Sequence, residues 1–393
     1  MVSKLLAADI VAAANSLTAH WTDSLPRPPK VVSGLGLWPL LAELALGAGT
    51  DTRAELVEAL GKDPSPGDVA AVASLLASSP DARCALGTWA GPRIALDPEW
   101  VDSLPEGTLG SLTGDPRADQ DRLDAWAAEQ TRGLIEEIPL DMSQKPDLVL
   151  ASALTVLLEW RQAFTPRPTL IDSGPWTSPE PWQGLTLTAG AADLRYTDGL
   201  TKWTARGKED VDVVLAIGSP EVSDQYVLSE TVRTAADADW GSPAAGLAVG
   251  DSGPGFTVEE APGPAPGEDG EAAVSTVAFD LKERLDLLED ADVLGLRTAS
   301  DRDRADFSRL SAAPGCYVGQ AKQDSVATFS ATGFEAASVT AVGMLRMAAV
   351  APPKGTHARV ELAFDRPFAY AAVHRPSGAV LLAGWVDSPQ RAR

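Results

Sequence analysis

One segment carries most of the information about architecture: Val31-Val-Ser33-Gly-Leu-Gly36-Leu-Trp-Pro-Leu-Leu-Ala-Glu-Leu-Ala-Leu-Gly47-Ala-Gly-Thr-Asp-Thr52-Arg-Ala-Glu-Leu-Val-Glu-Ala-Leu60. Apolar residues are dense from Trp38 to Leu46, which predicts a helix that ends at the glycines after it. The side-chain oxygens of Thr50-Asp51-Thr52 suit the start of a second helix, because they can accept the free N–H groups of a first turn. The segment therefore predicts two consecutive helices joined by a short turn.

The rest of the chain predicts a mixture of helices and strands. Leu148–Leu158 is almost wholly apolar, which fits either a buried strand or a helix. Residues 241–273 are rich in Gly, Pro, Ala and acids, so we expect a long loop or insert there. Further helices are expected at Leu5–Trp21, Ala70–Ala77, Asp121–Glu137 and Leu281–Glu289, and strands at Val211–Ile217, Val274–Phe279, Val360–Phe364, Phe368–Val373 and Ala379–Val386. No internal repeat or second linker is evident, which predicts a single α+β domain over residues 1–393.

The composition excludes several classes of function. Of 393 residues, 45% are apolar and 22% are charged, which is usual for a globular protein. The 32 basic and 55 acidic residues give a net charge of −23, which disfavours binding to nucleic acid or to an anionic membrane. With three histidines and two cysteines, Cys84 and Cys316, we expect neither a disulfide framework nor a metal site, and no cofactor.

The chain lacks a run of about 18 uncharged apolar residues, so no transmembrane helix is expected. Its first residues resemble a signal peptide, but Asp9 interrupts the apolar stretch and Lys4 is the single positive charge before it. We therefore expect a helix of the folded protein and a cytoplasmic location, with the extracellular space as the alternative.

One motif suggests a hydrolase. Gly250-Asp-Ser252-Gly-Pro-Gly255 resembles the nucleophile segment of trypsin-like proteases, and His20 precedes it in the chain. A catalytic serine must be held rigidly beside a base and two oxyanion donors. Ser252 lies in the part of the chain that is poorest in large apolar residues, so we expect a turn there and no catalytic residues.

Five segments in the same order resemble the serpins, a family of serine protease inhibitors. The first is the helix pair quoted above, and the others lie across about residues 15–389. They are Trp126-Ala-Ala-Glu-Gln-Thr131-Arg-Gly133-Leu-Ile135, Leu150-Ala-Ser152-Ala153 with Trp160 and Phe164, Leu294-Gly295-Leu with Ala305-Asp306-Phe307-Ser308, and Asp365-Arg366-Pro367-Phe368 with Gly384 to Pro389. The resemblance implies a serpin-like domain of about eight to nine helices around three mixed sheets, with an exposed reactive loop.

The resemblance places the reactive loop at residues 333–353, with a hinge at its start. The hinge is Gly333-Phe334-Glu335-Ala336-Ala337-Ser338-Val339-Thr340. Ala336, Ser338 and Thr340 are small and alternate at the period of a strand, and no proline occurs from Gly333 through Val350. Such a segment suits insertion between two strands of a sheet. The scissile bond is expected at Met347–Ala348, with Arg346–Met347 as the alternative.

The mechanism implied by the resemblance is suicide inhibition of a serine protease. The protease forms an acyl ester with the loop, the cut loop inserts into the main sheet, and the catalytic geometry is distorted before the ester is hydrolysed. The resemblance therefore implies a monomeric inhibitor that is not an enzyme. Its partner would be the target protease. The alternative is a non-inhibitory serpin-like protein with a structural or binding role.

The resemblance also assigns the shutter and breach residues that control opening of the sheet: Ser33, Ser152, Trp160 and Gln323. Gln323 stands at the position of the family's shutter histidine, so the sheet is expected to open differently. Phe334 stands where inhibitors usually carry Thr or Ser. We expect its large ring to impede insertion, which would leave a substrate in place of an inhibitor.

Overall fold

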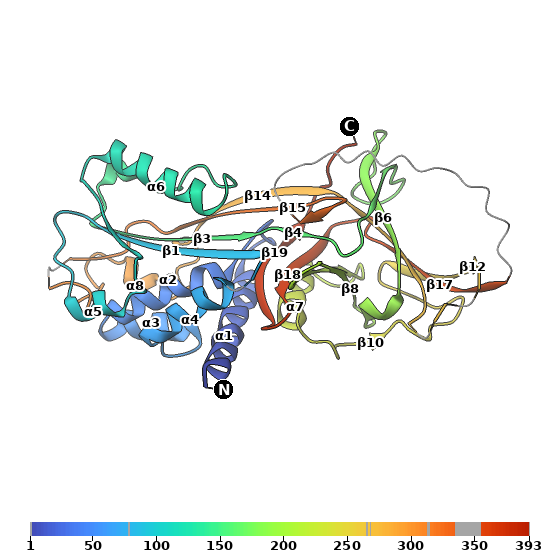
Figure 1. Ribbon diagram of the computed structural model, residues 1–393, viewed down its shortest axis with the longest axis horizontal. Helices are drawn as coiled ribbons and strands as arrows, with labels where there is room; N and C mark the ends of the chain where they lie inside the picture. The colour runs from blue at the N-terminus through green and yellow to red at the C-terminus, as the bar shows by residue number, and fades with distance from the viewer. Residues whose placement is uncertain are drawn as a thin grey trace.

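Helices and strands alternate along the chain much as the sequence predicted (Figure 1). The computed structural model describes residues 2–77, 79–264, 266–267, 269–312, 315–334 and 355–392. Within them lie eight α-helices, and the predicted α+β class is confirmed. In Figure 1 the helices α2 to α5 and α8 lie below one half of a long sheet, while α6 lies above it.

The first helices form a group beneath that sheet. The eight helices have the bounds α1 Val2–Ser24, α2 Gly34–Gly47, α3 Thr50–Leu60, α4 Pro66–Ala77, α5 Pro98–Ser103, α6 Pro116–Gln130, α7 Asp224–Thr234 and α8 Arg297–Ser300. Ser33 caps α2, because its Oγ accepts the N–H of Gly36 at 3.0 Å. The helix predicted at Asp121–Glu137 ends earlier, at Gln130, because Arg132 and Gly133 take positive φ angles of 54° and 82°.

Two hydrogen-bonded sheets share one chain segment, and we call them together the main sheet. Their strand orders are β2-β1-β3 and β14-β15-β16-β4. The strands are β1 Ala82–Ala90, β2 Leu109–Ser111, β3 Leu148–Val156, β4 Leu158–Glu159, β14 Phe279–Asp286, β15 Lys322–Phe329 and β16 Gly333–Phe334. Leu157 alone separates β3 from β4, so the segment predicted as strand or helix is a strand that belongs to both parts.

Two further sheets build the other half of the molecule, which makes three sheets with the main sheet. The second has the order β10-β7-β8-β9-β18-β19, with bounds Ser242–Pro243, Leu194–Tyr196, Leu200–Arg206, Val211–Gly218, Phe368–His374 and Ala379–Val386. The third has the order β11-β12-β17-β13-β6-β5, with bounds Ser252–Gly253, Phe256–Pro262, Thr356–Ala363, Ala272–Val277, Trp182–Ala189 and Thr165–Thr169.

The helix predicted at Leu281–Glu289 is wrong, because this segment contains most of strand β14. Leu281, Leu285 and Leu288 recur at helical spacing, which explains the prediction. The segment instead pairs with β15 from Phe279 opposite Phe329 to Asp286 opposite Lys322. Pairing with a distant strand outweighs the local preference.

The loop predicted over residues 241–273 is also wrong in part, because it contains strand β12. Phe256 and Val258 are 3% exposed and belong to the core, whereas Thr257 and Glu259 are exposed. The alternation is present in the sequence, but the glycines and prolines on both sides conceal it in an average over the segment.

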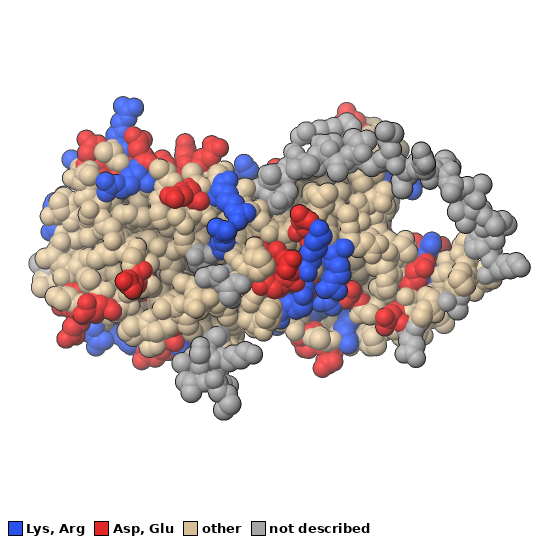
Figure 2. All heavy atoms as spheres, in the orientation of Figure 1, with Lys and Arg blue, Asp and Glu red and all other residues tan. Residues whose placement is uncertain are grey.

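The core is continuous from the helices to the third sheet, and large side chains such as Trp38, Trp203 and Tyr370 are fully buried in it. A smaller cluster lies between α6 and β1 around Leu123 and Trp89. Figure 2 shows acidic and basic side chains interspersed over one face of the molecule. In the described part of the chain, no helix combines the length and apolar character that a membrane span requires.

Candidate functional site

The start of the predicted hinge forms a short strand, β16, inside the main sheet. Phe334 lies opposite Leu158 of β4 on one side and opposite Phe329 of β15 on the other. Both pairings are antiparallel, and Gly333 and Phe334 already lie between these two strands. A Cβ on residue 333 would lie 2.1 Å from the Leu158 carbonyl oxygen, so this close approach requires glycine.

Trp160, predicted as a breach residue, fixes the turn that precedes the hinge. Its Nε1 donates to the carbonyl oxygen of Ser330 at 2.9 Å, and its backbone N–H donates to that of Thr332 at 3.0 Å. Within the turn, Ser330 Oγ accepts the N–H groups of Thr332 and Gly333. The turn therefore holds Gly333 beside the C-terminal end of β15, which we call the upper end of the main sheet, by contacts from both Trp160 and Ser330.

Phe334 is buried beneath the sheet, with 1% of its surface exposed. Its ring centroid lies 6.0 Å from that of Tyr370, whose hydroxyl donates to the carbonyl oxygen of Lys30 at 2.9 Å. We expected the ring to impede insertion. In the structure the ring is already accommodated between the strands, and its effect on insertion stays a prediction.

The main sheet is open from Phe334 toward the N-terminal ends of β3 and β15, a direction that we call down the strands. Within the described residues, β3 and β15 share no hydrogen-bonded register, and a cavity of ≈ 490 Å³ lies along the two strands. We call this opening the slot. Its other walls come from α2, through Leu37 and Leu41, and from the segment around α6, through Trp126 and Ile135. Strand edges without a partner are templates for an additional strand.

The predicted shutter residues lie in the walls of the slot. Gln323 of β15 donates from Nε2 to the carbonyl oxygen of Ser33 at 2.9 Å, and its Oε1 accepts the Ser33 N–H at 3.0 Å. Ser33 Oγ also donates to Leu381 O at 2.7 Å. On the opposite wall, Ser152 Oγ of β3 donates to Gly36 O at 2.5 Å. Both walls are therefore tied to the first turn of α2.

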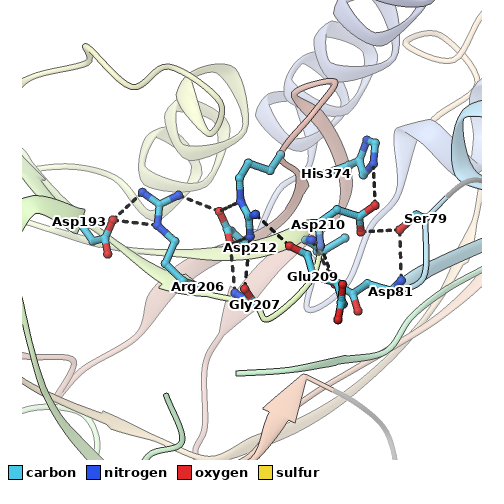
Figure 3. A network of polar contacts seen from close by, with 11 residues as sticks. Ser79, Asp81, Asp193, Arg206, Gly207, Glu209, Asp210, Asp212 and His374 are labelled. Carbon is cyan, nitrogen blue, oxygen red and sulfur yellow. Dashed lines mark hydrogen bonds and ion pairs between the residues drawn. The ribbon is translucent and has the colours of Figure 1, made fainter. Parts of the chain in front are cut away.

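A polar network holds β4 in place at the upper end of the slot (Figure 3). Asp212 is almost fully buried and accepts hydrogen bonds from Arg206 Nη1 at 2.8 Å, Arg375 Nη2 at 2.7 Å and the Gly207 N–H at 3.0 Å. Burial raises the pKa of Asp212, but the hydrogen bonds from Arg375 and Arg206 outweigh it and lower the pKa. Gly207 in turn forms a bridge with Trp160.

The same network reaches the junction of β3 and β4. Ser79 Oγ donates to Asp210 Oδ1 at 2.7 Å, and His374 Nε2 lies 3.3 Å from Asp210 Oδ2 (Figure 3). Asp81 accepts the N–H of Asp210 through its side chain and the N–H of Leu157 through its carbonyl oxygen. Burial raises the pKa of Asp81. These contacts fix the strand against which Gly333 and Phe334 pair.

The structure thus brings Ser33, Ser152 and Gln323 together around the slot and places Trp160 above it. The hinge residues Glu335, Ala336, Ala337, Ser338, Val339 and Thr340 and the expected scissile-bond residues Arg346, Met347 and Ala348 lie outside the described residues. The rejected hydrolase motif gains no support. Ser252 pairs with Thr257 in a hairpin, and His20 on α1 contacts Ser16 one turn away.

Sequence reasoning missed the network around Asp212 and the burial of Phe334. Arg375 and Asp212 are far apart in sequence and belong to no local motif. Phe334 carried a usable signal, since a large apolar residue beside a glycine at a strand boundary is usually buried.

Comparison with known proteins agrees with this geometry. The family model described as "Serpin (serine protease inhibitor)" matches residues 13–173 and 270–389. The chain is 25% identical to putative serpin-Z12 of Oryza sativa subsp. japonica, over 91% of this chain and 85% of the relative. It is 31% identical to the leukocyte elastase inhibitor of Equus caballus, over 30% of each chain. The fold resembles that of the thermophilic serpin tengpin in its native state, with a TM-score of 0.72 at 16% identity over 96% of this chain and 93% of tengpin.

Members of this family target serine proteases and are generally inhibitors rather than catalysts. The family model covers well over half of the sequence. This chain belongs to the serpin family.

Proposed function

We propose that the protein inhibits serine proteases as a suicide substrate, by inserting its cut loop into the slot of the main sheet. One observation carries the proposal. Gly333 and Phe334 are already paired between β4 and β15, next to an opening whose two strand edges have no partner among the described residues. The chain that follows Phe334 needs only to continue in the same direction to fill it.

The existing register predicts how that chain would pair. Continued from Phe334, it places Thr340 opposite Ser152 of β3 and opposite Gln323 of β15. Directly opposed residues point to the same face of a sheet. Ala336, Ser338 and Thr340 would therefore face α2 and the core as Phe334 does, and their small size suits that face. Thr340 would meet the two shutter residues with a hydroxyl group.

Insertion is expected to release considerable free energy. A strand of roughly 12 residues would add on the order of ten ladder hydrogen bonds of about 1 kcal/mol each. Burial of its inward face would add a few kcal/mol more, at about 25 cal/mol per Å². The sum is comparable with the whole stability of an ordinary domain, about 5–15 kcal/mol. The uncut protein is therefore proposed to be metastable.

The expected scissile bond sets the class of target. Cleavage at Met347–Ala348 would suit chymotrypsin- or elastase-like proteases, whereas cleavage at Arg346–Met347 would suit trypsin-like ones. The leukocyte elastase inhibitor among the relatives supports an inhibitory function, although its identity with this chain is confined to 119 aligned residues.

The test is incubation with trypsin-, chymotrypsin-, elastase- and subtilisin-like proteases, followed by denaturing electrophoresis and mass spectrometry. We expect a covalent complex with at least one of them that survives SDS, and a released C-terminal peptide that begins at Ala348 or Met347. Complete cleavage within the loop by every protease, without a complex, would contradict inhibition and support the non-inhibitory alternative.

A further inference from the structure

The third sheet contains a strand that the family model does not cover. Strand β12 lies within residues 174–269, between the two matched regions. It pairs with β17 over its whole length, from Phe256 opposite Leu362 to Pro262 opposite Thr356. Since β13 pairs with the other side of β17, β17 is an interior strand that would lie at the edge of the sheet without β12.

Strand β17 is the segment to which the C-terminal end of the reactive loop is attached. Its attachment to β12 begins at its first residues, where Thr356 Oγ1 donates to Glu260 Oε1 at 2.6 Å and the Gly263 N–H donates to Gly355 O at 3.0 Å. Phe256 and Val258 anchor β12 in turn, because both are 3% exposed. The start of β17 is therefore held by backbone, side-chain and core contacts.

The length of the loop decides whether an uncut chain could fill the slot. In the existing register, residue 344 would lie opposite Leu148 at the lower end of β3, about 33 Å below Phe334 at about 3.3 Å per residue. The chain from residue 344 to Gly355 spans at most about 40 Å when fully extended. Figure 1 shows that β3 lies in the left half of the molecule, whereas β17 lies near the right-hand end of the long axis. A return path of that length would not reach it unless β17 left its sheet.

We propose that β12 is a clamp on β17 that prevents the uncut loop from inserting, so that the sheet fills only after a protease has cut the loop. This inference rests on the proposed function. It assigns to the insert the control of spontaneous inactivation, since an uncut inserted chain would be stable but would present no loop to a protease.

Backbone geometry supplies a matched pair of variants. The Val258 N–H donates to Asp251 O at 2.9 Å, on the side away from β17. Successive N–H groups of a strand point to opposite sides, so the N–H of Glu259 points toward β17 and that of Glu260 points away. Both side chains are exposed. Glu259→Pro therefore breaks the ladder with β17, whereas Glu260→Pro removes the same charge and the exposed side-chain bond from Thr356 but leaves that ladder intact.

The experiment incubates the purified uncut proteins at a fixed temperature and follows thermal midpoint, chain mass and complex formation. We expect Glu259→Pro to convert to a form with a raised thermal midpoint, an unchanged mass and no inhibitory activity. This conversion should be at least about five-fold faster than in the wild type and in Glu260→Pro, because one ladder hydrogen bond of about 1 kcal/mol is lost. Equal conversion rates would refute the clamp. If Glu259→Pro does not fold, Thr257→Pro tests the next ladder position, with the same two outcomes.

A separate measurement distinguishes failure of the clamp from failure of the proposed function. Wild-type protein cut in its loop should show a raised thermal midpoint whether or not β12 acts as a clamp. If the cut wild type shows no rise, loop insertion itself is refuted. If it shows the rise and the two proline variants behave alike, only the clamp is refuted.

Discussion

Gln323 is joined to Ser33 by two hydrogen bonds that use both ends of its amide, at 2.9 Å from Nε2 and 3.0 Å to Oε1. The pair ties β15 to the residue that caps α2, and it does so at the wall of the slot. The two residues therefore link opening of the main sheet to the helix beneath it. Glutamine thus supplies a donor and an acceptor at the position where the family resemblance led us to expect a histidine.

Replacement of Gln323 should weaken the uncut protein. In Gln323→Ala, the Ser33 N–H loses its partner in a partly buried site, and the Ser33 carbonyl keeps only the N–H of Leu37. This loss should lower the free energy of unfolding by about 1–3 kcal/mol. Asp324→Asn is the control, because Asp324 faces the opposite side of the sheet and pairs with Arg284, whose side chain is 58% exposed. Loss of this ion pair should lower the free energy of unfolding by less than about 1 kcal/mol. Equal urea midpoints for the two variants would show that the pair does not stabilise the closed sheet.

Phe334 should act as an anchor of the hinge. Because its side chain is buried against Tyr370, Phe334→Thr should lower the free energy of unfolding of the uncut protein by about 2–4 kcal/mol. If insertion continues the existing register, the ring stays where it is, so the number of inhibitor molecules consumed per protease should not improve. The earlier expectation of a ring that impedes insertion predicts the reverse. An improved stoichiometry without loss of stability would favour that view.

In the proposed register Ser338 and Ala337 would face opposite sides of the sheet, so the same substitution at the two positions forms a matched pair. An arginine at position 338 would face α2 and the core during insertion, and burial of its charge would be costly. Ser338→Arg should therefore turn the inhibitor into a substrate that is cut without forming a complex. An arginine at position 337 would face the α6 side of the sheet, so Ala337→Arg should retain more complex. The ratio of complex to cut protein on a denaturing gel measures both, and identical ratios would mean that the register is wrong.

Glu43 should make stability depend on pH. Burial raises its pKa to about 7 from 4.5, although a hydrogen bond from Thr88 lowers it in part. Its Oε1 has no hydrogen-bond partner among the described residues, which suits a protonated carboxyl group. Since the folded state holds the proton more tightly than the unfolded state, the free energy of unfolding should fall as pH rises from about 4.5 to about 7, by on the order of 3 kcal/mol in total.

Glu43→Gln should remove that dependence, because the amide carries no charge in either state. Denaturant titrations at pH 5 and pH 8 should then show a smaller difference for the variant than for the wild type. Glu58→Gln, an exposed residue of α3, controls for the loss of one negative charge. A wild-type slope retained in Glu43→Gln would assign the effect to other groups.

The sequence predicted the fold where local patterns and the final structure agree. Trp38–Leu46 and Arg53–Leu60 lie within α2 and α3, and strands β18 and β19 lie at the C-terminal segments that were predicted as strands. It was wrong where a distant partner decided the conformation. The leucines of β14 have helical spacing, but the segment pairs with β15. The short alternation of β12 gains its stability from β17, about a hundred residues later in the chain.

For the site, the resemblance named individual residues, but the sequence did not predict the contacts that they make. Ser33, Ser152, Trp160 and Gln323 came from the resemblance, and the structure places them around and above the slot. The spacing of these residues gives no indication of which atoms bond. The burial of Phe334 was not predicted, because the sequence does not reveal that its ring packs beside Tyr370. The Asp212 network joins segments that meet only in the folded chain.

The most direct test of the account is the thermal midpoint of the protein before and after a single cut in its reactive loop. If the loop enters the slot, the cut protein should melt on the order of 10–20 °C higher, since each added kcal/mol shifts the midpoint of a chain of this size by roughly 1 °C. If the cut and uncut proteins melt at the same temperature, the slot does not receive the loop, and the proposal of a metastable inhibitor is wrong.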